Sequence, residues 1–460
     1  MYWRPRPYLL LLVGLVGCGG QADPSVADLP LANQTQPATT LIRFPADGGK
    51  PTLYPPASLR PIDWRVPAGV LPPAHRTVGV DLDQRLAFLL AQDHTLVGLD
   101  LTSGRVRTFL DSVAYAVLGP DGTVFSVDQE LTVSQLRRRT PVRLSGQLEA
   151  VPVAAYGTRT GKLMTLSGTD SMALTVLSND QPPVSIPLPP GATAATHWGD
   201  LLAVATDSGM VLYQPGTTEP VSFLPMSPGP TDMVFSPSGH RIYTVSSDAQ
   251  LRVFDRYGEQ QLSAIDLPGV AETVRSDPYG GWLLLRPVGT DSVWVVDVGT
   301  NTLIGQAETA WADDFPTIIG NLLLVRQSGD IVSLDVTQDV FEERGRIVGG
   351  GNDVFLTVAW TPRDDDRYDE LLAHDDVDGT GAPATIYLQI SSSRNPAWAQ
   401  NLVNLMSAAG LPATMLEPGE GEDAYRVVIG PYANREQADT VARTLGRPSF
   451  IYQQRVEVEQ

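Results

Sequence analysis

Short apolar segments that recur at a nearly constant interval constrain this chain more than any other feature. Between residues 66 and 361 these segments alternate with turns rich in Gly, Asp, Ser and Pro. If the segments are grouped in fours, the end of the third segment of each group recurs at spacings of 35, 43, 36, 41, 42 and 38 residues, a mean of about 39, which is typical of four-stranded propeller blades. The spacing therefore predicts an all-β propeller of about seven blades over residues 66–361. The seven positions are Asp100, Gln135, Ser178, Gln214, Asp255, Asp297 and Asp335.

Composition agrees with many short strands and limits the partners. The 460 residues include 42 Gly and 38 Pro, which favour tight turns. The formal net charge of −20 argues against nucleic acid, because phosphate contacts need a basic surface. A chain of this length also has room for a second, smaller domain.

The clearest blade, residues 231–268, predicts four strands. Its apolar segments span residues 233–235, 241–245, 250–254 and 261–265. We expect the ring to close by pairing an early strand, residues 76–82, with the segment "NDVFLTVAW" at 352–360, because a closed ring leaves no long exposed edge.

The turns of two blades resemble those of YVTN-type and quinoprotein-type propellers. "TLVGLDLTSGRVRTFL" and "SVWVVDVGTNTLIGQAE" both end their third strand in Asp, at Asp100 and Asp297. The Asp side chain is expected to accept hydrogen bonds from turn amides, and Gly104 or Asn301 to adopt a positive φ. These residues indicate structure, not catalysis.

The amino terminus predicts export. Residues 1–17 join Arg4 and Arg6 to an apolar run, as in a signal peptide, and the run is too short to span a membrane. "LVGC" resembles the bacterial lipobox, which implies that Cys18, the sole cysteine, is lipidated. Because Gly19 follows it rather than Asp, we expect anchoring in the outer membrane, facing the periplasm. Residues 18–65 are then expected to form a flexible tether.

An acidic linker is expected at residues 362–383. Asp376, Asp378 and Gly381 match the first half of a calcium loop, but position 12 is Tyr387 rather than the bidentate Glu that such a loop needs. A solvated linker without a metal site is the favoured interpretation.

The last part of the chain predicts a β-α-β-β-α-β order. Strands are expected at residues 385–390, 413–416, 425–429 and 449–454. Asn395 and Pro396 should begin the first helix, with an apolar stripe of Trp398, Leu402, Leu405, Met406 and Ala409 that ends at Gly410. Asn434 and Gln437 form a capping box for the second helix, which should bury Ala438, Val441, Ala442 and Leu445.

These segments resemble the SPOR (sporulation-related) domain over residues 384–456. The family's first pattern, V-Q-V-G-S-F, corresponds to Leu388 to Ser393, where serines replace the Gly and the Phe. The second pattern, Y-R-V-x-V-G-P-F, corresponds to Tyr425 to Tyr432. The resemblance implies an α+β fold and binding to peptidoglycan glycan strands that lack stem peptides, in cell division or cell-wall maintenance.

Strand alternation then selects candidate glycan-binding residues. Tyr425, Val427 and Ile429 should face the helices, so Arg426 and Val428 should lie on the open sheet face with Tyr387 and Gln389. Amide, hydroxyl and guanidinium groups beside an aromatic ring suit a sugar polymer. The predicted glycan-binding residues are Tyr387, Gln389, Ser392, Arg426 and Val428.

No pattern in the sequence predicts an enzyme. The five histidines lack HxH or HExxH spacing, and there is no G-x-S-x-G or Walker motif. We therefore expect no catalytic residue, metal or cofactor, and a propeller that serves as a scaffold for an unknown protein partner. The alternative is a lactonase-like or quinoprotein-like propeller, catalytic or ligand-binding, that the SPOR domain delivers to the septum.

Overall fold

The computed structural model describes residues 39–362 and 385–454 apart from single positions and short gaps. The gaps longer than one residue are 65–67, 138–139, 169–171, 190–191, 198–200, 257–258, 338–339, 394–395, 409–410, 418–424, 433–436, 439–440 and 442–449. The leader, Cys18, the acidic linker with its half calcium loop, and Asn434 lie outside the described residues.

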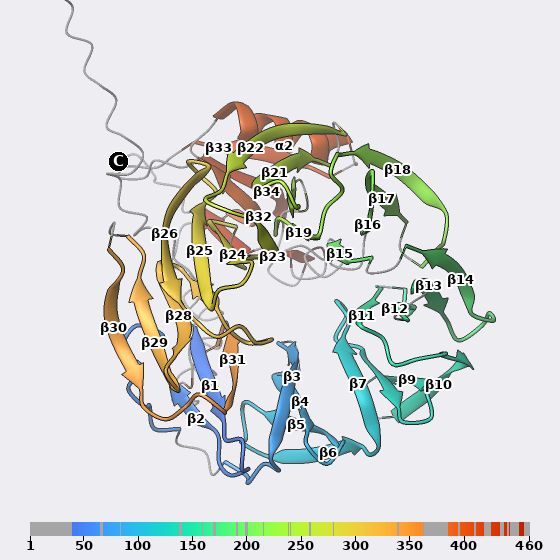
Figure 1. The fold of residues 1–460 in the computed structure, drawn as a ribbon, viewed down its shortest axis with the longest axis vertical. Helices are drawn as coiled ribbons and strands as arrows, with labels where there is room; N and C mark the ends of the chain where they lie inside the picture. Colours follow the sequence, from blue (N-terminus) through green and yellow to red (C-terminus); the bar gives the residue numbers. More distant parts are fainter. Residues whose placement is uncertain are drawn as a thin grey trace, which may run out of the picture. The chain divides into compact units, whose positions relative to one another are not determined.

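Seven four-stranded antiparallel sheets, counted in the described residues, form blades 1 to 7. The first strand of each lies nearest the central axis, and the blades follow one another around it (Figure 1). The prediction of about seven blades is confirmed. Blade 1 consists of β3 (Ala74–Asp81), β4 (Leu86–Ala91), β5 (Leu96–Asp100) and β6 (Val106–Leu110), and blade 2 of β7 (Val113–Leu118), β8 (Val124–Asp128), β9 (Thr132–Arg137) and β10 (Thr140–Gln147). Blade 3 consists of β11 (Ala154–Gly157), β12 (Leu163–Ser167), β13 (Met172–Leu177) and β14 (Val184–Leu188), and blade 4 of β15 (Ala194–His197), β16 (Leu201–Thr206), β17 (Gly209–Tyr213) and β18 (Pro220–Pro225). Blade 5 consists of β19 (Asp232–Phe235), β20 (Arg241–Val245), β21 (Gln250–Asp255) and β22 (Gln260–Asp266). Blade 6 consists of β23 (Ala271–Ser276), β24 (Trp282–Pro287), β25 (Ser292–Asp297) and β26 (Thr302–Glu308), and blade 7 of β27 (Thr317–Ile319), β28 (Leu322–Gln327), β29 (Asp330–Asp335) and β30 (Glu342–Ile347).

An additional three-stranded sheet, blade 8, completes the ring between blades 7 and 1. It joins β31 (Val354–Val358) to two strands from the other end of the chain, β1 (Thr40–Phe44) and β2 (Thr52–Tyr54), in the order β2-β1-β31. A single bridge from Leu53 to Ile62 stands where the fourth strand would lie. The innermost strand of this blade thus comes from late in the chain, and the remainder from its beginning.

Blade 8 corrects two expectations. The expected tether, 18–65, is folded from Thr40 onward, since β1 and β2 are hydrogen-bonded strands with buried side chains. The late strand β31 pairs with β1 and not with residues 76–82, which form β3 and pair with β4. The physical reason is that β3 is the innermost strand of its own blade and already pairs with β4. By contrast, β1 contributes the fully buried side chains of Leu41, Ile42 and Phe44 to the apolar clusters on the two sides of blade 8.

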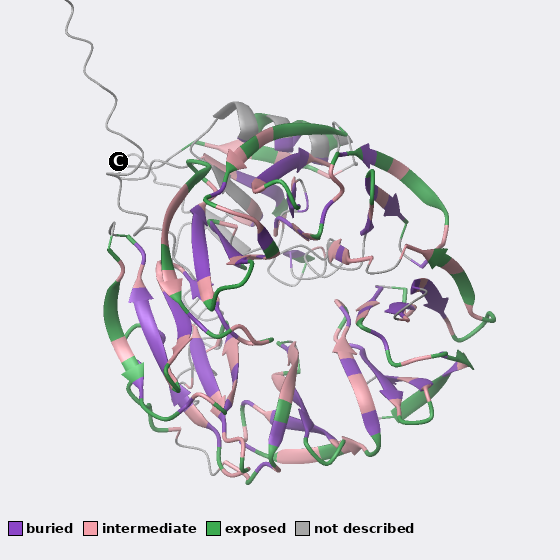
Figure 2. Ribbon diagram, in the orientation of Figure 1, coloured by how far each residue is buried: buried purple, intermediate pink, exposed green. Residues whose placement is uncertain are grey.

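Burial follows the position of each strand in its blade. Middle strands such as β12 and β16 are buried almost throughout, whereas outermost strands such as β14 and β22 are largely exposed (Figure 2). Buried clusters fill the spaces between neighbouring blades. Continuous apolar segments such as "LLAVAT" therefore form strands with both faces buried.

The blade turns confirm the role expected for Asp. Asp100 Oδ1 accepts hydrogen bonds from the amides of Thr102 (2.9 Å) and Ser103 (2.8 Å). Asp297 Oδ1 does the same for Gly299 at 2.7 Å. The following residues, Gly104 and Asn301, have φ values of 68° and 54°, as the turn geometry requires.

The carboxy-terminal module is a second, smaller sheet in the order β33-β34-β32-β35. Its strands are β32 (Thr385–Ser393), β33 (Ala413–Leu416), β34 (Tyr425–Tyr432) and β35 (Phe450–Gln454), and its described helix is α2 (Pro396–Ala408). These bounds agree closely with the predicted strands and with the predicted helix start. Within the described residues, no helix has the length and apolar character to cross a membrane.

Candidate functional site

One face of the carboxy-terminal sheet is closed by α2. The helix buries Ala399, Leu402, Val403 and Met406 against Val427 of β34, with Ile390, Ala413, Met415 and Tyr425 packed beside them. Val427 and Tyr425 therefore face the helix as predicted, and Leu388 and Ile429 are fully buried. Ala399 and Val403 are part of this packing although the sequence pattern did not select them. The side chains of Trp398 and Leu405 lie outside the described part of the chain.

The opposite face brings together the predicted polar residues. Gln389 of β32 pairs with Val428 of β34, which also pairs with Thr414 of β33. Ser392 pairs with Arg426 in the same two strands. Because directly paired residues in antiparallel strands share a face, the side chains of Gln389, Val428, Thr414 and Arg426 lie on the side away from Val427 and α2. Tyr387, two residues before Gln389, lies on that side too.

A β-bulge interrupts the regular alternation of β32 between Gln389 and Ser391. Gln389 and Ser392 are three positions apart, so in a regular strand they would point to opposite faces. The register shifts between Gln389 and Ser391, with one extra residue in β32. Because of this shift, Ser392 lies opposite Arg426 in the register, while its side chain is outside what the structure describes. Ser391 and Ser393, which replace the family's Gly and Phe, and Ser392 between them therefore continue strand β32 instead of forming a loop.

One predicted contact residue is wrong. Val428 is fully buried, although it was expected on the open face of the sheet. It lies in β34, which has a neighbouring strand on each side, and its short side chain stands between its register partners Gln389 and Thr414. Thr414, which is exposed, is a further residue on this face that a ligand could reach. It was missed because the sequence "ATML" carries no polar alternation that would single it out.

Two tyrosines border a glycine next to this row. A Cβ atom at Gly430 would lie 3.2 Å from ring atoms of both Tyr387 and Tyr432, so the absence of a side chain lets the two rings approach one backbone position. Burial raises the pKa of Tyr432. An aromatic surface therefore lies beside Gln389, and a sugar ring could stack on it while amide and guanidinium groups bond its hydroxyls.

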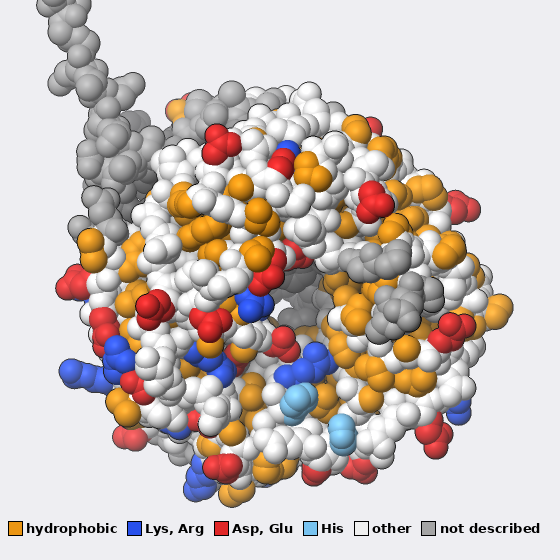
Figure 3. Space-filling view, in the orientation of Figure 1, with side chains coloured by type: hydrophobic (Ala, Val, Ile, Leu, Met, Phe, Trp, Pro, Cys, Tyr) orange, Lys and Arg blue, Asp and Glu red, His pale blue; other side chains and the backbone are white. Residues whose placement is uncertain are grey.

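The propeller has its own concentration of charge, around the central opening. Side chains of both signs border this opening (Figure 3). Several of them are used to join one blade to the next. Arg76 of β3 donates to Ala116 O of β7 at 2.8 Å, with its guanidinium over the Tyr115 ring. Tyr156 of β11 donates to Ala194 O of β15 at 2.5 Å.

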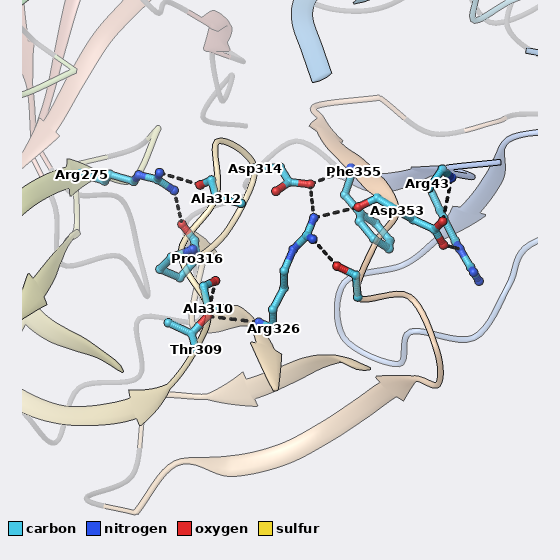
Figure 4. Close-up of polar contacts among 12 residues, drawn as sticks. Arg43, Arg275, Thr309, Ala310, Ala312, Asp314, Pro316, Arg326, Asp353 and Phe355 are labelled. Carbon is cyan, nitrogen blue, oxygen red and sulfur yellow. Dashed lines mark hydrogen bonds and ion pairs between the residues drawn. The ribbon is translucent and has the colours of Figure 1, made fainter. Parts of the chain in front are cut away.

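The same arrangement continues around blades 5 to 7. Asp232 of β19 accepts a hydrogen bond from the amide of Val274 in β23 at 2.9 Å. Arg275 of β23 donates to Ala312 O at 2.6 Å and Pro316 O at 3.2 Å in the connection before β27 (Figure 4). Burial raises the pKa of Asp232 and lowers the pKa of Arg275. Both charged side chains therefore bind the backbone of a neighbouring blade.

Arg326 is the centre of the connection between blades 7 and 8. Its Nη2 donates to Asp314 Oδ2 and to Asp353 O, each at 2.7 Å, and its Nη1 donates to Gly351 O (Figure 4). Asp314 also accepts from the amide of Phe355 in β31 at 2.9 Å. Burial raises the pKa of Asp314, and Arg326 opposes that rise.

Metal ligands do not converge in the described residues, where no group of three or more His, Cys, Asp or Glu side chains could hold an ion. His75 and His94 are exposed. The side chain of His197, and the whole of His240 and His374, lie outside what the structure describes.

Comparisons with known proteins agree with this division of the chain. Residues 382–452 match the model of the SPOR domain. The structure of apo AztD from Citrobacter koseri is similar at a TM-score of 0.52 and 12% identity, covering 70% of this chain and 98% of that one. The dihydro-heme d1 dehydrogenase NirN in complex with DHE is similar at a TM-score of 0.46 and 14% identity, covering 69% and 76%.

At 12% identity the likeness to AztD concerns the fold alone. A search of curated proteins finds no match. The propeller's fold is therefore clear without a specific function, while the carboxy-terminal match carries functional information. The chain contains a β-propeller followed by a SPOR domain, and the SPOR domain implies peptidoglycan binding in the cell envelope.

Proposed function

We propose that this chain is a lipid-anchored envelope protein that binds peptidoglycan glycan strands, in particular denuded septal strands, through its SPOR sheet. The observation that carries the proposal is the placement of Gln389, Thr414 and Arg426 on the sheet face away from α2, with the Tyr387 ring on the same face. Its location would be the outer membrane, facing the periplasm, with Cys18 as the lipid attachment. Its process would be cell division or cell-wall maintenance.

The chemistry of this face supports a glycan rather than a cationic ligand. Its described residues offer amide, hydroxyl, guanidinium and phenol groups and no carboxylate, although the chain carries 52 acidic residues. Amide and guanidinium groups bond sugar hydroxyls and acetamido oxygens, and an aromatic ring stacks on the apolar face of a sugar. Arg426 also favours the anionic lactyl groups of a strand without stem peptides.

The propeller is proposed to be a scaffold for a protein partner. Arg76, Tyr156, Asp232, Arg275 and Arg326 all bind the backbone of a neighbouring blade. These hydrogen bonds help to hold the ring together. This use of the inner polar groups favours a scaffold over a lactonase-like or quinoprotein-like catalytic propeller.

Glycan binding is tested by co-sedimentation of the full chain with amidase-stripped sacculi. Gln389→Ala should weaken binding about fivefold and Arg426→Ala about 10- to 100-fold, as expected for loss of a neutral and a charged hydrogen bond. Gln400→Ala on α2 and Arg60→Ala are matched controls, because both side chains are exposed and neither lies on this face. Equal pelleting of all four variants and the parent would refute the assignment of this face.

The lipid anchor is tested separately in cells. Cys18→Ala should abolish incorporation of a radiolabelled or alkyne-tagged fatty acid and release the protein from the membrane fraction. Acyl labelling that persists in this variant would contradict the assignment of Cys18, because it is the only cysteine.

A further inference from the structure

The two ends of the propeller meet in one pair of strands. β1 and β31 are antiparallel, with register pairs running from Thr40↔Val358 to Phe44↔Val354. The chain enters blade 8 at Thr40, and after Val358 it leaves toward the SPOR domain. The segment that leads from Cys18 and the segment that leads to the SPOR domain are therefore attached at the same end of the same strand pair.

This attachment decides how tension acts on the propeller. A force that separates Thr40 from Val358 acts across one register pair at a time, beginning at the loaded end. A force that separates Thr40 from Val354 would act along the strands and load all five register pairs together. The first geometry peels the strands apart and the second shears them, although the hydrogen bonds are the same.

We propose that the pair of strands β1 and β31 in blade 8 opens under force: tension between a membrane anchor and a glycan-bound SPOR domain peels β1 from β31 and opens the ring. This strand pair is called the seam below. This inference rests on the proposed function, which supplies the two anchors. The load path runs directly from Thr40 to Val358, so blades 1 to 7 carry no tension until the seam has opened. Opening leaves the edge of β31 unpaired, and an unpaired edge can accept a strand from another protein.

The contacts along the seam set the order of opening. At the loaded end, Thr40 Oγ1 donates to Trp360 O at 2.6 Å. At the far end, Arg43 Nε donates to Asp353 Oδ2 at 2.5 Å and the amide of Ala46 donates to Asp353 Oδ1 at 2.8 Å. Peeling thus begins at a single side-chain hydrogen bond and reaches the Arg43 ion pair last, so the contacts of Asp353 are the last to break.

The test is single-molecule force spectroscopy on the chain without its leader, carrying Cys18→Ser. Peptide handles before residue 22 and in the linker at residue 380 load the seam in the peeling direction. A matched control keeps the first handle and moves the second to the exposed turn after Val348, which loads the same pair in shear. We expect a first event in the peeling geometry that extends the chain by about 100 Å, the extended length of residues 40–71, and a several-fold higher rupture force in shear.

A covalent lock makes the outcome decisive. Thr40→Cys with Val358→Cys joins directly paired positions, whose separation in an antiparallel pair suits a disulfide. The oxidised variant should lose the first event, and reduction should restore it. A first event that persists in the oxidised variant, or equal rupture forces in the two geometries, would overturn the proposal. Because no glycan is present, failure here is distinguishable from failure of glycan binding, which the sacculus assay reports alone.

Discussion

Replacing Phe44 by Ala is expected to lower the unfolding free energy of the propeller by about 3–5 kcal/mol, the usual cost of removing a buried phenyl ring. Phe44 is fully buried. It belongs to the cluster that joins blade 8 to blade 1, together with Ile42, Leu53 and Leu89. This loss combines the transfer free energy of the phenyl ring with the cost of the cavity that its removal leaves between blades 8 and 1. The turns on either side hold these two blades in place.

The predicted shift in melting temperature follows from the size of the propeller. About 320 residues unfold with an entropy near 2.1 cal/mol/K each, so the loss corresponds to about 4–7 °C. Differential scanning calorimetry of the full chain measures it. Phe223→Ala is the matched control, because Phe223 lies on the outer strand β18 with 45% of its surface exposed. A Phe44→Ala variant that melts with the parent and with the control would show that residues 40–44 are not part of the folded ring.

Two further predictions concern buried charges of the propeller. Arg326→Met should destabilise it by about 3–5 kcal/mol, since Asp314 keeps a buried charge without its partner; adding Asp314→Asn should recover part of that loss in urea unfolding, and a double variant no better than the single one would contradict the pairing. Burial raises the folded-state pKa of Asp232 above its unfolded value, so this carboxyl favours folding at pH below about 4 and loses that contribution as pH rises through the folded-state pKa. The stability of Asp232→Asn relative to the parent should therefore increase from pH 3 to pH 7, and a pH-independent difference would refute the assignment.

The sequence predicted those elements whose partners are close along the chain. Each strand of blade 5 was expected within one residue of its observed bounds at either end, because its neighbours follow after short turns. β1 escaped detection for the opposite reason. "TLIRF" is five residues long within a stretch rich in Pro and Gly, and its partner β31 lies about 310 residues later.

In the SPOR sheet the sequence predicted which residues share a face better than it predicted how exposed those residues are. Alternation placed Gln389 and Arg426 on the open face, and the register confirms that they share it. It could not reveal the bulge after Gln389, because "LQISSS" alternates without interruption up to Ile390. Nor could it show that Val428 is covered, since the burial of a residue in a central strand depends on side chains of the two adjacent strands.

The origin of blade 8 from both ends of the propeller also fixes an order of events during synthesis. β1 is made first, yet β31, its inner partner, is made about 310 residues later. Until then "TLIRF" has no β31 edge beside it, and blades 1 to 7 can assemble only into an open arc. An emerging chain therefore exposes an apolar strand at one end of the arc and an unfilled place at the other. The pairing of β1 with β31 therefore cannot form until Val358 has been made, and residues 40–44 lack their inner partner strand until then.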